Sequence, residues 1–142
     1  MNLRVIIVDP DEGMLKLLTI LVRRMGHEVV ALKEPTSCPV YSNESSKCGQ
    51  NHPCGDLLIL NNQLHKNTGL KLIDQQARGG CKAAPRNKLV LSASSNSEAE
   101  LQYAKEIGCQ VIKKPFHLDD IKKWIDATEK LIAPNRKLAE LL

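Results

Sequence analysis

Apolar residues follow two patterns that alternate along the chain. Five short runs are apolar at nearly every position, which is typical of strands buried on both faces of a sheet. These runs cover residues 3–8, 28–32, 57–60, 89–91 and 111–112. Between them, apolar residues recur every three or four positions, as on the buried face of a helix. Helices are therefore expected over residues 11–25, 70–78, 97–107 and 118–132. Because parallel strands need crossover helices, the alternation predicts an α/β fold with one doubly wound, five-stranded parallel sheet and helices on both faces.

The alternation is interrupted between residues 36 and 55, where a second helix would be expected. This stretch has no apolar periodicity and contains three cysteines, two prolines and several serines. We therefore expect the second helix to be shortened or replaced by a cysteine-containing loop. The domain should cover residues 1–132, because Ala133-Pro134 ends the last helix. Residues 133–142 would form a C-terminal tail or linker stub, in which three leucines could begin another short helix.

The composition is that of one soluble domain. The chain has 142 residues, of which 42% are apolar and 25% charged, as in ordinary globular proteins. No apolar run approaches the ~20 residues of a membrane span, and the N-terminus lacks the features of a signal peptide. A cytoplasmic protein is therefore expected, with no membrane partner. The net charge of +4 comes from basic pairs interleaved with acids, and only 3% of residues are aromatic. Direct binding of nucleic acid is thus not expected.

Polar residues follow four of the five expected strands. Asp9 and Asp11 come after the first strand, Asn61 after the third, Ser92 after the fourth and Lys114 after the fifth. The carboxyl ends of parallel strands meet at one edge of the sheet, which is where open α/β sheets carry their functional loops. We therefore expect these side chains to be neighbours.

In the order of these motifs, the chain resembles a receiver domain of bacterial two-component response regulators, over residues 3 to about 132. The resemblance depends on four segments at the expected strand ends: Val8-Asp9-Pro10-Asp11, Asp56-Leu57-Leu58-Ile59-Leu60-Asn61 with Gly69-Leu70 downstream, Leu91-Ser92-Ala93, and Lys114-Pro115-Phe116. It implies the flavodoxin-like receiver fold, with strand order 2-1-3-4-5. It also implies an aspartyl-phosphate switch, in which an acid after the third strand takes a phosphoryl group from a histidine kinase.

The resemblance further implies roles for the other strand ends. In the family, a pair of acids after the first strand holds Mg²⁺, and a Ser or Thr and a Lys bind the phosphoryl oxygens. Ser92 and Lys114 match the last two positions. Lys114-Pro115 matches a bond that is commonly cis in the family, and proline makes the cis form accessible.

Two positions depart from the family pattern. Asn61 occupies the acceptor position, and an amide is a poor nucleophile toward phosphorus. Pro10 replaces the second metal-binding acid and has no ligand atom, whereas Mg²⁺ is held through carboxylates and waters. Asp9 is then the only aligned acid, and Lys114 can pair with it. We therefore interpret the chain as a degenerate receiver, or pseudo-receiver, with no Mg²⁺ at this site, no catalytic residue and no enzymatic activity.

Such a module would act by binding other signalling proteins or an attached output domain, or by forming a homodimer. In the family, the docking face consists of the fourth helix, fifth strand and fifth helix. The residues of that face here are Tyr103, Lys105, Lys122 and Lys123. An alternative stays open, in which Asp11 or Glu12 supplies the missing metal ligand and another acid, such as Asp56, is the acceptor.

The cysteines suggest a second kind of chemistry. Five cysteines in a reducing compartment should be free thiols. A tetrahedral Zn²⁺ site needs four nitrogen or sulfur ligands, and a structural zinc would order a long loop that has few apolar anchors. The candidate ligands are Cys38, Cys48, Cys54 and Cys81, with His52 as an alternative. Equally, these could be four unrelated thiols, or the input of a metal- or redox-responsive module. Cys109 is expected in the core.

Overall fold

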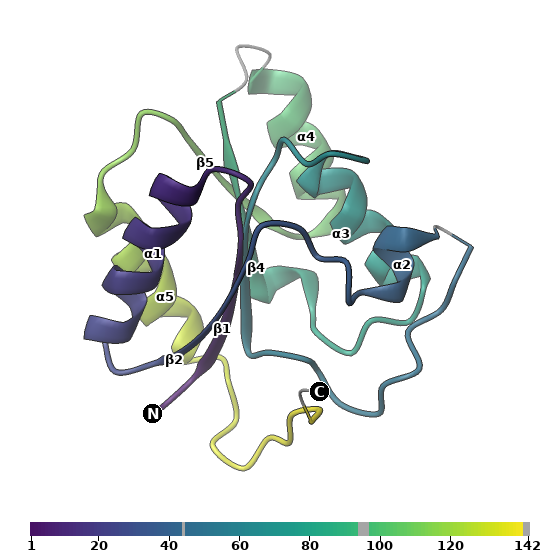
Figure 1. Ribbon diagram of the computed structural model, residues 1–142, viewed down its shortest axis with the longest axis horizontal. Helices are drawn as coiled ribbons and strands as arrows, with labels where there is room; N and C mark the ends of the chain where they lie inside the picture. Colours follow the sequence, from purple (N-terminus) through teal and green to yellow (C-terminus); the bar gives the residue numbers. More distant parts are fainter. Residues whose placement is uncertain (44, 94–96, 141–142) are drawn as a thin grey trace.

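The fold follows the alternation of the sequence. A computed structural model describes residues 1–43, 45–93 and 97–140, except for the side chain of Ser97. Its five parallel strands form one sheet in the order β2-β1-β3-β4-β5 (Figure 1). The strands are β1 (Arg4–Val8), β2 (Glu28–Leu32), β3 (Leu57–Asn61), β4 (Lys88–Ser92) and β5 (Gln110–Lys113). The helices are α1 (Glu12–Arg24), α2 (Pro39–Ser42), α3 (Gly69–Arg78), α4 (Ser97–Ile107) and α5 (Leu118–Glu129), with a 3₁₀ turn η1 (Pro85–Asn87). The predicted fold class and strand order are confirmed.

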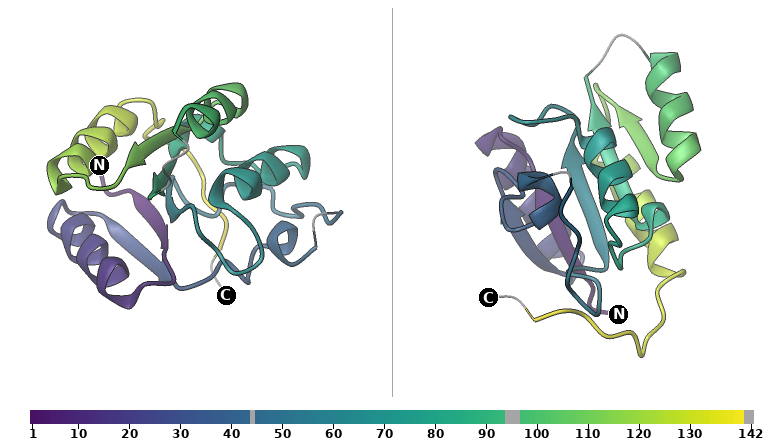
Figure 2. Two further views of the ribbon diagram at one scale, coloured as in Figure 1. Left: turned by 90° about the horizontal axis from the view of Figure 1, so that it is seen from above. Right: turned by 90° about the vertical axis from the view of Figure 1, so that its right-hand side faces the viewer.

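Helices cover both faces of the sheet. α1 and α5 lie on one face, and α2, α3 and α4 lie on the other (Figures 1 and 2). On the first face, Val5 and Ile7 of β1 pack in one cluster with Ile121 of α5. On the second face, Leu60 of β3 packs in another cluster with Leu72 of α3. Since both faces of the central strands β1, β3 and β4 are covered, apolar residues are favoured at successive positions of these strands.

Local signals determine where the first and third helices begin and end. The Asp11 side chain caps α1, and Thr68 Oγ1 caps α3 by accepting a hydrogen bond from the Lys71 amide at 3.2 Å. Gly26 follows α1 with a φ of 92°, a left-handed conformation that glycine adopts without strain. These caps place the first turns of α1 and α3 beside the carboxyl ends of β1 and β3.

The second helix is shortened, as predicted. α2 is a single turn of four residues, and residues 45–56 contain neither helix nor strand. The part of the sheet that a longer α2 would cover is therefore screened by this loop. No helix in the described ranges has the length and apolar character needed to cross a membrane.

Two expectations near the C-terminus are wrong. α5 ends at Glu129 rather than residue 132, and Leu131, which lies in the part expected to be helical, is 54% exposed. Residues 133–140 contain no helix. They run back beneath the amino ends of the strands (Figures 1 and 2), where backbone and side-chain hydrogen bonds hold them. The last two residues, which would complete the expected helical face, lie outside the described residues.

Candidate functional site

Asp9 directly follows β1 and is completely buried at the carboxyl edge of the sheet. Its Oδ1 accepts a hydrogen bond from the Asp11 amide at 2.9 Å, whereas Oδ2 is buried without a hydrogen-bond partner among the described residues. Burial raises the pKa of the Asp9 carboxyl, and the Asp11 amide and the charge of Lys114 only partly oppose this effect. A buried carboxylate with an unpaired oxygen is unfavourable, so ionised Asp9 destabilises the fold.

The two acids that follow it have other roles. Asp11 is the N-cap of α1, and its Oδ1 accepts hydrogen bonds from first-turn amides at 2.9 and 3.3 Å. Glu12 forms an ion pair with Lys33, just beyond β2, and this contact lowers the pKa of the Glu12 carboxyl. Both acids are exposed. These contacts hold both carboxylates on other partners, and the charge of Asp11 further raises the pKa of Asp9.

Asn61 is the last residue of β3, and its amide is engaged at both ends. Oδ1 accepts a hydrogen bond from Lys114 Nζ at 3.2 Å, and Nδ2 donates to the Gln63 carbonyl at 3.1 Å. The expected pair between Lys114 and Asp9 is therefore wrong, because Lys114 is bonded to Asn61 and acts on Asp9 only through its charge. The physical reason is access: Asp9 is fully buried, whereas Asn61 is only half-buried.

Ser92, the last residue of β4, contacts a carboxylate that sequence reasoning did not place in the site. Its hydroxyl donates to Glu100 Oε2 at 2.6 Å, and Asn62 Nδ2 donates to Glu100 Oε1 at 3.0 Å. Asn62 Oδ1 in turn accepts from the Leu70 amide at 3.1 Å, which holds the start of α3. In the sequence, Glu100 is the last residue of a capping-box pattern, Ser97-Glu98-Ala99-Glu100, which indicates the start of a helix and not a functional site.

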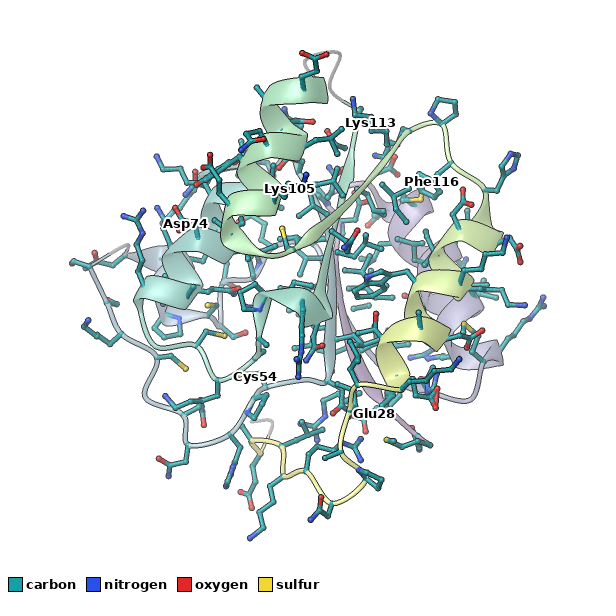
Figure 3. The ribbon with its side chains drawn as sticks, turned by 180° about the vertical axis from the view of Figure 1, so that it is seen from behind. Glu28, Cys54, Asp74, Lys105, Lys113 and Phe116 are labelled. Atoms are coloured by element: carbon teal, nitrogen blue, oxygen red, sulfur yellow. The ribbon has the colours of Figure 1, made fainter. Side chains whose placement is uncertain are left out.

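Lys114 is positioned by the end of β5. Its amide donates to the Ser92 carbonyl at 2.8 Å, which extends the pairing of β4 and β5 by one residue. The Lys114–Pro115 peptide bond is cis, as the resemblance implied. Figure 3 shows the neighbouring Lys113 and Phe116 at the same end of the sheet.

These groups do not suit Mg²⁺. Asp9 is the one buried carboxylate at the end of β1, and Pro10 beside it has no ligand atom. The Asn61 amide oxygen is bonded to the Lys114 ammonium, whose positive charge opposes a divalent cation at the same place. The Gln63 carbonyl accepts from the Asn61 amide. A hard cation held by carboxylates and waters therefore has too few anionic ligands here.

The residues of the expected docking face are not all on one side. Lys105 of α4 and Lys122 and Lys123 of α5 are exposed. The Tyr103 hydroxyl instead donates to Asp74 Oδ2 of α3 at 3.0 Å. Figure 3 shows Asp74 on α3 and Lys105 on α4, so Tyr103 is turned toward the junction between these two helices.

The cysteines lie away from this edge. The four candidate zinc ligands line one cavity on the α2 side of the sheet, together with His52. These ligands are Cys38, Cys48, Cys54 and Cys81. In Figure 3, Cys54 lies at the opposite end of the sheet from Lys113 and Phe116. Cys109 is buried in the core, as expected, and burial raises the pKa of its thiol to about 11.

The fold of this chain is similar to those of known proteins. No protein-family model and no curated protein sequence matches the chain. The receiver domain of a Francisella response regulator is similar, with a TM-score of 0.72, 14% identity, and coverage of 92% of this chain and 98% of that one. The non-phosphorylated HemR receiver domain from Leptospira biflexa has a TM-score of 0.68 and 21% identity, covering 93% and 98%. The BeF₃-activated DrrB receiver domain has a TM-score of 0.68 and 14% identity, covering 92% and 99%. The chain has the receiver fold.

Within the receiver fold, the predicted site residues are partly assembled. Asn61 and Lys114 are in direct contact, and Asp9 is close enough for its pKa to respond to Lys114. Ser92 is tied to Glu100 beside them. Asp11 belongs to the helix cap rather than to this group.

The unpaired carboxyl of Asp9 predicts that Asp9→Asn stabilises the protein at neutral pH. The substitution keeps an oxygen for the Asp11 amide and removes a buried charge. Because the folded state holds the Asp9 proton more tightly than the unfolded state does, stability falls as pH rises from the unfolded pKa through the raised folded pKa. The advantage of the variant should be absent below the unfolded pKa and complete above the folded one.

Urea unfolding of both proteins at several pH values measures this difference. The matched control is Asp11→Asn, which keeps an effective N-cap and should change stability by less than about 0.5 kcal/mol. A loss of stability in Asp9→Asn at neutral pH would show that the Asp9 charge has a stabilising partner.

Proposed function

We propose that this chain is the receiver module of a two-component response regulator system and that it signals by binding other proteins, without accepting a phosphoryl group. The similar structures that support the first part are receiver domains over nearly their whole length. The observation that carries the second part is the Asn61 amide, held between the Gln63 carbonyl and the Lys114 ammonium.

The chemistry of the site supports this reading. Aspartyl phosphorylation needs a carboxylate oxygen as nucleophile, and an amide offers none. It also needs a cation to offset the charge of the transferred group, whereas Asp9 lacks a second acid beside it. The Glu100 carboxylate adds a negative charge next to Ser92, where the resemblance places the phosphoryl oxygens. Two like charges would repel each other there. The module is accordingly proposed to have no enzymatic activity and no Mg²⁺.

The alternative acceptor finds little support. Asp56, the acid considered for that role, precedes β3 and lies at the amino edge of the sheet. Its carboxylate accepts hydrogen bonds from Arg136 at 2.8 and 2.7 Å and from the Arg4 amide at 2.8 Å. A phosphoryl group there would meet neither Lys114 nor Asp9.

The proposed partners are other signalling proteins, an attached output domain or a second copy of the chain. The exposed lysines of α4 and α5 alternate with acids of the same helices, and Lys123 forms an ion pair with Asp119 at 3.5 Å. Leu101 of α4 adds an apolar side chain that is 47% exposed. Exposed charges of both signs mainly set the rate of association and the choice of partner. The cytoplasm remains the proposed location.

Incubation of the unaltered protein with a small-molecule phosphodonor and Mg²⁺ tests the proposal. The intact mass should not change, and beryllofluoride with Mg²⁺ should leave the amide NMR spectrum as it was. A parallel sample of an ordinary receiver with an aspartate acceptor shows that the donor is active. A stable phosphoryl adduct on this chain, located by peptide mapping to any acid of the site, would refute the proposal.

A further inference from the structure

The shortened α2 leaves a cavity of about 160 Å³ against the sheet. Apolar residues of β1 and β3, such as Ile6 and Leu58, line it on the sheet side. The opposite wall carries the four cysteines outside the core and His52. These thiols come from parts of the chain far apart in sequence, so the tertiary fold brings them to one place.

The backbone fixes three of the cysteines beside α3. Cys38 is the N-cap residue of α2. The Cys48 amide donates to the Gly79 carbonyl at 2.8 Å, and the Cys81 amide donates to the Gln76 carbonyl at 2.9 Å. A side chain at Gly79 would approach Val40 to 2.9 Å, so a glycine there lets the loop lie this close to the end of α3.

Cys54 closes the group from the amino edge of the sheet. Its carbonyl accepts a hydrogen bond from Arg4 Nη1 at 3.1 Å. Its thiol lines the same cavity as those of Cys38, Cys48 and Cys81. Four thiols around one cavity supply the number and kind of ligands that a tetrahedral Zn²⁺ site needs.

A buried ammonium group contacts one of these sulfur atoms. Lys88 is 1% exposed, and its Nζ donates to Gln76 Oε1 at 2.7 Å and to Cys81 Sγ at 3.4 Å. The Gln76 amide, in turn, donates to Cys38 Sγ at 3.6 Å. Within the described parts of the chain, Lys88 forms no ion pair with a carboxylate. A buried positive charge is stabilised by an anionic partner, and the Cys81 sulfur would be such a partner as a thiolate.

We propose that Cys38, Cys48, Cys54 and Cys81 together bind one Zn²⁺ ion. Binding converts four neutral thiols and Zn²⁺ into a tetrathiolate complex of net charge −2 and releases four protons. Lys88 then supplies a compensating positive charge, and Lys88 and Gln76 donate hydrogen bonds to two of the ligands, as outer partners of metal sites commonly do. The proposal does not depend on whether the receiver site accepts phosphate.

Binding also involves a movement of the loop. As they stand, no three metal-ligating side chains of the described residues are grouped closely enough to hold an ion. Residues 45–56, which carry two of the cysteines, contain no helix or strand. Chelation would draw this loop over the cavity and order a segment that packing alone holds weakly.

Metal analysis of the full-length protein, expressed with added zinc and purified without chelator, tests the site. One zinc per chain is expected, and Co²⁺ substitution should give the intense visible absorption of a tetrahedral thiolate complex. The variants Cys38→Ser, Cys48→Ser, Cys54→Ser and Cys81→Ser should each lose the metal. The matched control Cys109→Ala should keep it, and His52→Ala should keep it if all four ligands are sulfur.

The unaltered protein provides a second measurement that does not depend on how the variants fold. Zinc should protect four of the five thiols from alkylation, as counted by mass, and a chelator should expose them. Zinc or cobalt retained in Cys48→Ser, or absence of both metals from the unaltered protein, would overturn the proposal. A disulfide among these cysteines in metal-free protein would overturn it in favour of a redox role.

Lys88 is proposed as a positioning residue for this site. Lys88→Met should weaken zinc binding by about 10- to 100-fold, while the cobalt spectrum keeps its thiolate character because all four ligands remain. Competition with a chromogenic chelator measures the affinity. An unchanged affinity in Lys88→Met would show that the ammonium does not act on the metal site.

Discussion

The double substitution Asn61→Asp and Pro10→Asp should make the protein accept a phosphoryl group from a small-molecule donor in the presence of Mg²⁺. Position 61 then carries a carboxylate nucleophile at the end of β3, within reach of the Lys114 ammonium that now contacts the amide oxygen. Position 10 supplies the second acid beside Asp9. Together these changes restore a pair of carboxylates for the cation and a nucleophile for covalent transfer.

The single variants separate these two contributions. Pro10→Asp alone should remain unmodified, because the acceptor is still an amide. Asn61→Asp alone should react weakly, since the metal has one acid beside the acceptor. Intact mass spectrometry after incubation with donor, with and without chelator, measures each case. Modification of the double variant that persists after chelation of Mg²⁺ would contradict the reasoning.

The Glu100 carboxylate should limit the fraction of the double variant that becomes phosphorylated. Its carboxylate accepts the Ser92 hydroxyl at 2.6 Å and adds negative charge where the phosphoryl oxygens would lie. Adding Glu100→Gln to the double variant should therefore raise the modified fraction further, because the amide keeps hydrogen-bonding atoms for Ser92 and Asn62 without the charge. In the proposed function, three features then oppose phosphorylation, and the position of Glu100 beside Ser92 was visible only in the folded chain.

Arg136→Ala should lower the free energy of unfolding by about 3 kcal/mol. Asp56 is buried, with a side chain only 1% exposed, and Arg136 meets it with two hydrogen bonds at 2.8 and 2.7 Å. Removing the guanidinium leaves a buried carboxylate paired only with the Arg4 amide. The loss of stability comes mainly from the buried Asp56 charge that is left without a cationic partner, and less from the lost attraction between Asp56 and Arg136.

Denaturant unfolding measures the effect, with Lys137→Ala as the matched control. Lys137 is the exposed neighbour of Arg136, and its removal should change stability by less than about 0.5 kcal/mol. In an Asp56→Asn background, the cost of Arg136→Ala should become much smaller, because no charge is left unpaired. Equal costs in the two backgrounds would show that Arg136 stabilises the fold by some other contact.

The same interaction explains the course of the C-terminal tail. Arg136 also donates to the Asn2 carbonyl at 3.1 Å, and the Ala139 amide donates to the Pro53 carbonyl at 2.8 Å. Arg4 Nη1 contacts both the Ala139 and Cys54 carbonyls. The tail is thus attached to the loop that carries Cys54.

The arrangement of strands and helices was predictable because it depends on regular repeats of apolar residues. The bounds of β2 are those expected, and the other strands differ by one or two residues at their ends. The shortened α2 was predictable from the loss of periodicity after residue 35. The end of α5 was not, because Leu131 continues the apolar spacing although it is 54% exposed.

The sequence by itself determined which atoms are available: an amide at position 61, no ligand at position 10, and thiols in place of a second helix. The tertiary structure decided how these atoms are paired. Lys114 bonds to Asn61 across 53 residues, Glu100 reaches Ser92 and Asn62, and Arg136 meets Asp56 across 80 residues. Periodicity reports burial along one element. Hydrogen-bond pairing depends on the distances between side chains in the folded protein. Residues far apart in sequence become neighbours there, and no repeat in the sequence encodes those distances.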